Sequence, residues 1–510
     1  MAHKWWTLTA VCTGVFMLLL DVTIVNVALP SIQGAFSASL SDLQWVISAY
    51  ALTLAAFLLT AGSLADRFGR RLLFAIGIVL FTVGSFFCGI ATSAAMLTWS
   101  RAGQGIGGAI MFATSLALLA DAFRGRDRGT AFGVFGAITG VAVAVGPVLG
   151  GAITSGLSWR WIFFVNIPIG VAALAVTLLR VRESRDPNSS PPDLAGFVTF
   201  SSGLALLVFG LIRSTTDGWA SATVRGSLIA SAVLLAVFVV VERVQSAPML
   251  DLQLLRVPTF NGGLFAAWTI SASLFALLTY LVIYVQNVLG LSAVATGIRF
   301  LPLTGAIFVS AGVAGRLTTH VPRKLLIAPG FVLIGVGLLL MRGLTPASEW
   351  THLLPGMIVA GVGAGLVNVP LVSTAVGVVE PARAGMASGI NSTFRQIGIA
   401  TGVAALGTIF AANIRSGVVS RLSGTPLAPR ADSIAHTISN GGAGHAITSA
   451  PAPLRPLIAA AGRASFVDAL NLILLVGAIV ALVGVVVSLI LIRERDFVAL
   501  EVAEPTTVAA

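Results

Sequence analysis

Residues 62–71 read Gly62-Ser-Leu-Ala-Asp66-Arg-Phe-Gly69-Arg70-Arg71, a short polar stretch between two long apolar runs. The two glycines allow a tight turn, and Asp66 can cap a helix or pair with an arginine. A similar stretch returns half a chain later at 315–324, and residues 128–133 are likewise echoed at 384–389. The chain is therefore predicted to contain two related halves.

The composition indicates a membrane protein. Of the 510 residues, 57% are hydrophobic and only 10% are charged, whereas a soluble protein carries about a quarter charged residues. A helix needs roughly 20 apolar residues to cross a bilayer. Fourteen segments of this kind are predicted, at 8–29, 45–64, 72–94, 97–120, 131–154, 161–180, 194–213, 224–242, 260–285, 297–315, 325–343, 353–376, 388–411 and 468–491.

These segments predict an all-α integral membrane protein with fourteen transmembrane helices. Two pseudo-symmetric six-helix halves are expected over 1–190 and 257–510, with two inserted central helices over 191–256. The stretch 412–467 is rich in Ala, Ser, Gly, Pro and Arg. It is expected to be a long outer loop, a flexible flap with one short helix near 454–466.

The distribution of positive charge predicts the orientation. The net charge is +11, but the basic residues stand in small groups between the apolar runs, which argues against a nucleic-acid partner. With the N-terminus inside, more than half of the 30 basic residues lie on the inner side. By the positive-inside rule, both termini are cytoplasmic in a multi-pass protein of a bacterial-type inner (plasma) membrane.

Four further stretches carry a family resemblance. Arg101-Ala-Gly-Gln-Gly-Ile-Gly-Gly108 lies in the predicted fourth helix, Gly146-Pro147-Val-Leu-Gly150-Gly151 in the fifth, and Asp21-Val-Thr-Ile-Val-Asn26-Val-Ala-Leu-Pro30 in the first. With residues 62–71, they resemble the motifs of the major facilitator superfamily. The first-helix stretch and Trp159-Arg-Trp-Ile-Phe-Phe-Val-Asn-Ile-Pro168 are similar to those of its fourteen-helix drug:proton antiporters.

The resemblance assigns roles to two sets of residues. Gly62, Asp66, Gly69, Arg70 and Arg71 would form a conformational latch on the cytoplasmic face. Gly146, Pro147, Gly150 and Gly151 would form the antiporter motif. The second half has Thr319 where the first has its acid, which argues against a salt-bridged latch there. Protons are the expected coupling ion, without any other cofactor.

One acid stands apart from the other 18. Only Asp21 lies deep in a predicted span, about eight residues or 12 Å from its outer end. An ionised carboxylate there costs several kcal/mol unless it is paired. Arg101 lies roughly 7 Å inside the fourth helix, and the resemblance places both helices on one cavity. We expect Asp21 to carry the proton with Arg101 as partner; a purely structural Asp21, bonded to Thr23, Asn26 or a neighbouring helix, is the alternative.

Polar and aromatic residues within the spans are candidates for the substrate cavity, because ligand pockets combine apolar walls with a few polar groups. The candidates are Asn26, Gln44, Tyr50, Tyr280, Gln286, Asn391 and Arg395. Arg395 can instead extend to the cytoplasmic interface. Small amphipathic molecules, protons and the lipid bilayer are the expected partners, and the protein is expected to be a monomer.

The expected function is proton-coupled secondary active export of amphipathic drugs or antibiotics by alternating access. A dedicated exporter of one endogenous metabolite or lipid is an alternative within the same class. A membrane-embedded enzyme is disfavoured, because the five histidines lie in predicted tails and loops without metal-ligand spacing. Neither catalytic nor metal-binding residues are predicted.

Overall fold

The computed structural model describes residues 3–123, 126–185, 192–246, 248–318, 320–379 and 384–497, and this part of the chain contains helices and connecting segments without a strand. The helices are α1 His3–Phe36, α2 Leu40–Phe68, α3 Arg70–Gly89, α4 Ala94–Ala122, α5 Arg126–Gly156, α6 Trp161–Phe164, α7 Asn166–Arg180, α8 Leu194–Asp217, α9 Ala222–Val244, α10 Pro258–Ile270, α11 Ala276–Ile283, α12 Ala293–Leu317, α13 Lys324–Leu340, α14 Leu354–Gly377, α15 Ala384–Leu422, α16 Ala431–Ser439, α17 Ala443–Thr448 and α18 Arg455–Leu491. Two π-helical turns, Ser271–Phe275 and Tyr284–Val288, flank α11 and join it to α10 in one span. Thr319 lies outside the described residues.

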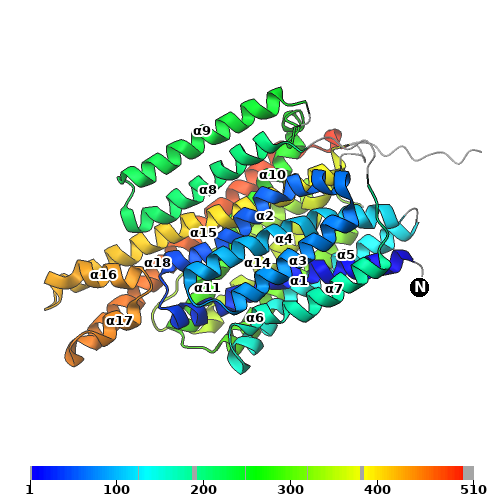
Figure 1. The fold of residues 1–510 in the computed structure, drawn as a ribbon. Helices are drawn as coiled ribbons and strands as arrows, with labels where there is room; N and C mark the ends of the chain where they lie inside the picture. Colours follow the sequence, from blue (N-terminus) through cyan, green and yellow to red (C-terminus); the bar gives the residue numbers. More distant parts are fainter. Residues whose placement is uncertain are drawn as a thin grey trace, which may run out of the picture.

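The helices run along a common direction, as membrane spans must when lipid offers no partner to a free backbone group (Figure 1). In the described part of the chain, thirteen helices are long and apolar enough to cross a bilayer. A fourteenth apolar helix, Lys324–Leu340, has 17 residues. The protein is therefore a multi-pass membrane protein, and each predicted span overlaps a helix, although several helices extend beyond the predicted ends.

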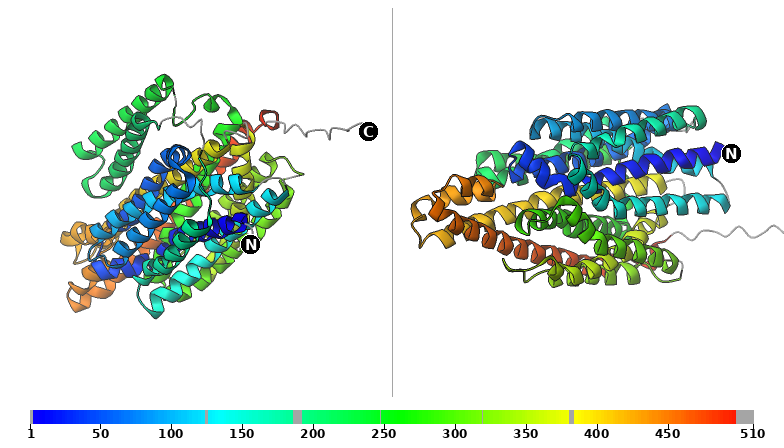
Figure 2. Two further views of the ribbon diagram at one scale, coloured as in Figure 1. Left: turned by 45° about the vertical axis from the view of Figure 1, so that its right-hand side comes forward. Right: turned by 90° about the horizontal axis from the view of Figure 1, so that it is seen from below.

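The spans pack in two groups. In the first, α4 lies between α2 and α3, while α1 contacts α5 and α7; in the second, α14 lies between α12 and α13, and α18 contacts α13 and α15. The groups meet where α2 packs on α15 and α5 on α12. One end of the bundle carries the N-terminus, and the opposite end, called the far end here, carries α16 and α17 (Figures 1 and 2).

Helices α8 and α9 form a hairpin at the side of the bundle, set apart from it in Figure 2. They pack chiefly on each other, and α8 also contacts α2 and α15. Both segments were predicted as the inserted helices. The boundary expected near residue 190 falls in 186–191, outside the described residues.

The segment expected to be a flexible outer loop, 412–467, is largely helical. Helix α15 continues to Leu422, α18 begins at Arg455, and α16 and α17 lie between them. An ion pair between Arg421 and Asp468 and a 3.2 Å hydrogen bond from Arg421 to Ser465 join the end of α15 to the first half of α18. The prediction was wrong because small residues and prolines suggested a linker, whereas here Ala and Ser form packed helices.

Glycine brings α3 and α4 into backbone contact. A Cβ added at Gly107 would lie 2.4 Å from the Phe81 backbone nitrogen, and the second group repeats this geometry where a Cβ at Gly337 would lie 2.5 Å from the Ala360 nitrogen. Helices in lipid associate through such small residues, because there is no hydrophobic gain between apolar surfaces in an apolar solvent.

This contact predicts that Gly107→Ala separates α3 from α4 and destabilises the purified protein by about 1–3 kcal/mol, the usual cost of overpacking. Thermal melting in detergent would measure it. Gly103→Ala on the same helix is the matched control, because a Cβ there meets nothing within 4 Å. Equal melting temperatures for both variants would contradict the packing account.

Candidate functional site

Asp21 lies in the middle of α1 and its side chain has no solvent exposure. Because α1 continues to Phe36, Asp21 is about 15 residues or 22 Å from that end, so the prediction of eight residues was wrong. Arg101 also lies deeper than expected, about seven residues into α4, which begins at Ala94. Both predicted spans were too short at the far end.

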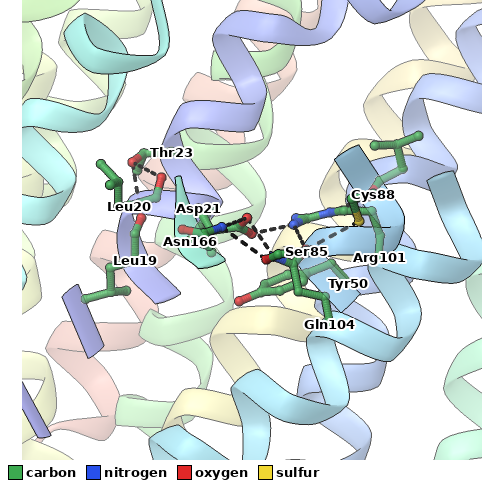
Figure 3. A network of polar contacts seen from close by, with 12 residues as sticks. Leu19, Leu20, Asp21, Thr23, Tyr50, Ser85, Cys88, Arg101, Gln104 and Asn166 are labelled. Carbon is green, nitrogen blue, oxygen red and sulfur yellow. Dashed lines mark hydrogen bonds and ion pairs between the residues drawn. The ribbon is translucent and has the colours of Figure 1, made fainter. Parts of the chain in front are cut away.

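The carboxylate of Asp21 accepts hydrogen bonds from three side chains (Figure 3). Arg101 donates to Oδ2 and forms an ion pair with it. Gln104 of α4 and Asn166 of α7 donate to Oδ1 at 2.8 and 3.2 Å. Charge-assisted hydrogen bonds of this kind suit an ionised carboxylate. We call Asp21, Arg101, Gln104, Asn166 and Ser85 the Asp21 network.

Ser85 of α3 completes the network, since its hydroxyl accepts from Gln104 at 2.7 Å and from Asn166 at 3.2 Å. All five residues are buried. Sequence reasoning missed the roles of Ser85, Gln104 and Asn166, although two of them stand in the quoted motifs. Their burial in apolar helices requires polar partners, and that requirement was the signal available.

Arg101 is stabilised on every side. Its guanidinium lies 4.1 Å from the centre of the Tyr50 ring and 5.9 Å from that of Phe163. It also donates to Gln104 Oε1 at 2.6 Å and to the Val46 carbonyl at 3.4 Å. An arginine fits such a site because its planar fork can bond and stack at once. Removing one member of a buried pair costs about 3–5 kcal/mol.

The residues predicted as an antiporter motif lie where α5 contacts α1 of its own group and α12 of the other. A Cβ at Gly146 would lie 1.9 Å from Thr23 Oγ1, and one at Gly150 would lie 2.7 Å from Ile24, so both positions press on α1 beside Asp21. One residue further, a Cβ at Gly151 would lie 2.4 Å from the Ala293 carbonyl of α12. Pro147 takes part as well: its carbonyl oxygen would be 2.2 Å from a Cβ at Gly297 of α12.

Further contacts between the two groups gather at the far end. Gln286 donates to the Val27 carbonyl at 2.7 Å, and the Val294 amide donates to Ser155 at 3.2 Å. The Leu40 amide donates to the Asn440 carbonyl at 2.9 Å, which ties α2 to the region between α16 and α17. These hydrogen bonds hold the two groups together at the far end in this structure.

The loop predicted as a latch lies at the N-terminal end. Asp66, near the end of α2, and Arg70, the first residue of α3, form an ion pair at 2.8 Å across the turn at Gly69. Gly69 has a φ of +123°, and a Cβ there would lie 2.7 Å from the Glu183 carboxyl. That carboxylate accepts from the amides of Arg71 and Leu72 at 2.9 and 3.1 Å and so caps α3. Gly62 has open space around it.

Glu183 was not predicted, and it has a counterpart in the second group. Glu494, after α18, accepts from the Arg323 amide at 3.1 Å and lies 3.8 Å from the Arg323 guanidinium. In each group, a carboxylate that follows the last helix thus meets the start of the third helix. The repeated loop motif alone could not show this, because the acids lie far away in sequence.

The cavity candidates divide into two sets. Gln44, Tyr50, Tyr280 and Asn391 are buried; Tyr280 donates to the Val403 carbonyl at 2.6 Å, and Gln44 donates to Tyr280 at 3.2 Å. In this structure these side chains are enclosed by their neighbours. Asn26, Gln286 and Arg395 are partly exposed.

Arg395 lies about 16 Å from the start of α15 at Ala384. Within the described residues, it has neither an ion pair nor a hydrogen bond, and it is a positive charge well inside the span. The same part of the chain holds no group of three or more His, Cys, Asp or Glu side chains that could bind a metal.

Comparison with known proteins agrees with this architecture. The family model of the Major Facilitator Superfamily matches residues 11–403. The chain is 37% identical to Multidrug resistance protein Stp of Mycobacterium tuberculosis, over 80% of this chain and 76% of Stp. It is 35% identical to Puromycin resistance protein pur8 of Streptomyces alboniger, over 80% and 82% of the two chains.

Solved structures show the same fold. A bacterial homologue of the human lysosomal transporter Spinster, in an inward-facing and occupied conformation, aligns with a TM-score of 0.65 at 14% identity, over 98% of this chain and 99% of the other. The human organic anion transporter MFSD10 aligns with a TM-score of 0.56 at 15% identity, over 94% and 99%. The chain belongs to the major facilitator superfamily of membrane transporters.

Proposed function

We propose that this transporter exports amphipathic drugs or antibiotics in exchange for protons, by alternating access. Relatives at 35–37% identity are named for multidrug resistance, puromycin resistance and the export of tetracenomycin C, which supports the substrate class. The observation that carries the coupling is the buried pair of Asp21 and Arg101. An acid inside the membrane is costly and functional by default.

The proton would bind Asp21 in competition with Arg101. In the present arrangement, three side chains donate to the carboxylate, and the charge of Arg101 balances its own. When the far end opens, water can reach the network and loosen the Arg101 contact, and the carboxylate becomes free to take a proton. Closing restores the donors and expels the proton at the N-terminal end.

The antiporter motif would connect this chemistry to the motion. Gly146 and Gly150 press on Thr23 and Ile24, directly after Asp21, and Gly151 presses on α12 of the other group. A shift of α1 when Asp21 gains or loses its partner is therefore passed through α5 to the interface between the groups. Packed contacts of this kind move between discrete arrangements, since they cannot deform continuously.

The loop 62–71 would then act as the latch. Asp66, Arg70 and Arg71 interact within the first group and with Glu183 in this structure. An exchange of these partners for ones on the other group would lock the N-terminal end shut in the opposite state. We infer the same role for the Arg323–Glu494 contact.

The finer architecture belongs to the same proposal. Lys324–Leu340 is about 25 Å long at 1.5 Å per residue, which a tilted or thinned bilayer accommodates, giving fourteen spans. The helices before residue 190 and after residue 257 would form two pseudo-symmetric halves with α8 and α9 inserted. The N-terminal end would face the cytoplasm in a bacterial plasma membrane, and the protein would work as a monomer.

Substrate would reach the centre from the N-terminal end and contact Asn26, Gln286 and Arg395, the partly exposed candidates. The unpaired Arg395 favours molecules with an anionic or oxygen-rich group. A second candidate function is the dedicated export of one endogenous product, because related chains are named for the export of tetracenomycin C and cephamycin.

For the coupling step, Asp21→Asn is expected to reduce transport driven by a pH gradient in liposomes to the level of protein-free vesicles, since no proton can exchange. Counterflow without a gradient should persist. The double variant Asp21→Asn with Arg101→Gln removes both charges and so avoids an unpaired buried cation.

Asp217, at the far end of α8, forms an ion pair with Arg213 at 3.3 Å and accepts from the Thr216 hydroxyl at 3.0 Å. Asp217→Asn is the matched control and should transport normally. If the double variant is folded and still responds fully to the pH gradient, Asp21 has no part in coupling. In that case, Asp21 would have a purely structural role in the network.

For the substrate, expression in a host lacking its own pumps is expected to raise tolerance to several amphipathic antibiotics and dyes, and a protonophore should abolish their efflux. Minimum inhibitory concentrations and dye retention measure this. Protection against one compound alone would support the dedicated exporter, and efflux that survives the protonophore would refute proton coupling.

A further inference from the structure

Two acids outside the Asp21 network meet at the base of the α8–α9 hairpin, at the N-terminal end of the bundle. Asp193 precedes α8 and caps it: its Oδ1 accepts from the Gly196 amide at 2.8 Å. Glu242 lies in the last turn of α9, and its Oε2 accepts from the Leu250 amide at 2.9 Å. The two residues are only 4% and 3% exposed.

Each carboxyl has one oxygen without a hydrogen-bond partner, Asp193 Oδ2 and Glu242 Oε1. These two oxygens converge, because a Cβ built on Gly196 would lie 2.4 Å from the first and 2.5 Å from the second. A side chain at 196 would therefore displace one or both of these carboxyls. Buried polar atoms are rarely left unpaired, and here the unpaired atoms face each other.

No described cation neutralises the pair. The charged side chain that interacts electrostatically with Glu242 is Asp193, which carries the same sign of charge. Arg243 of α9 and Arg256 of the following linker are exposed. The neutral neighbours are Gln245, which donates to Asp193 at 3.4 Å, and Thr60 of α2, which donates to the Met249 sulfur at 3.5 Å. The apolar residues Met249, Leu250, Phe200 and Phe238 surround the base of the hairpin.

Two ionised carboxylates at this place would repel each other without screening by water. We propose that Asp193 and Glu242 share one proton, so that the hairpin base is a second protonation site, separate from Asp21. The shared proton gives one carboxyl an O–H donor for the unpaired oxygen of the other, which removes the repulsion and satisfies both atoms. Such a pair titrates as a unit.

The site links two connections of the chain. Asp193 lies on the path from the first group into the hairpin, and Glu242 holds the linker that leads through Leu250 to α10 of the second group. This linker also contacts α2 of the first group at Thr60. The shared proton would therefore hold together the hairpin, the linker to the second group and a helix of the first group. Loss of the proton as the pH rises separates the carboxylates and frees the linker, so the closed base is stable at lower pH and lost at higher pH.

Infrared difference spectroscopy of the purified transporter during a pH titration tests the proposal directly. We expect a protonated-carboxyl band that disappears as the pH rises, is absent in Glu242→Gln and in Asp193→Asn, and remains in Asp21→Asn/Arg101→Gln and in Asp217→Asn. Persistence of every such band in Glu242→Gln would overturn the proposal. The proposal would also be overturned if the two carboxylates carry no proton and added Na⁺ or Ca²⁺ stabilises the protein through them, because the pair would then be a cation-binding site.

Hydrogen exchange of the Leu250 amide supplies a second readout. In the wild type, its protection should be lost as the pH rises, beyond the intrinsic effect of pH on exchange. Glu242→Gln places a permanent NH₂ donor where the shared proton was, so this variant should keep the amide protected at all pH values. A wild-type amide whose protection follows only the intrinsic pH effect would contradict the shared proton.

Discussion

A carboxylate and a guanidinium, paired inside the bundle of apolar helices, constrain the rest of the molecule. Neither Asp21 nor Arg101 can stay there alone, because an isolated charge in a low-dielectric medium costs several kcal/mol. Their pairing therefore fixes α1 against α4, and Gln104, Ser85 and Asn166 bring α3 and α7 to the same point. The four helices that make up most of the first group meet at this network.

Glycines determine how closely the helices pack within each group and where α5 contacts its neighbours. Close backbone contacts between α3 and α4, and between α13 and α14, make each group a stiff unit. Helix α5 contacts α1 at Thr23 and Ile24, within one turn of Asp21, and contacts α12 of the other unit. In the proposed mechanism, a change of charge at Asp21 would therefore shift α1 where it packs on the helix that joins the two units.

The sequence could predict the spans, because twenty-residue apolar runs have few other solutions in a polytopic protein. It also singled out Asp21 and Arg101, since charge in such a run is rare. It could not predict the far-end geometry: α1 and α4 extend beyond their apolar cores, and residues 412–467 form helices from a composition typical of linkers. Glu183 and Glu494 were missed because their partners are distant in sequence, and Asp193 and Glu242 because their burial depends on how the hairpin folds onto its linker.

The central claim is that cargo binding and protonation of Asp21 belong to opposite states of the transporter, since cargo enters from the N-terminal end and the proton binds when the far end is open. Proton release on binding of a transported dye, measured with a pH indicator in weakly buffered detergent solution, tests it most directly. The account predicts release by the wild type and by Asp217→Asn, and none by Asp21→Asn/Arg101→Gln that still binds the dye. Equal release from that double variant would contradict it.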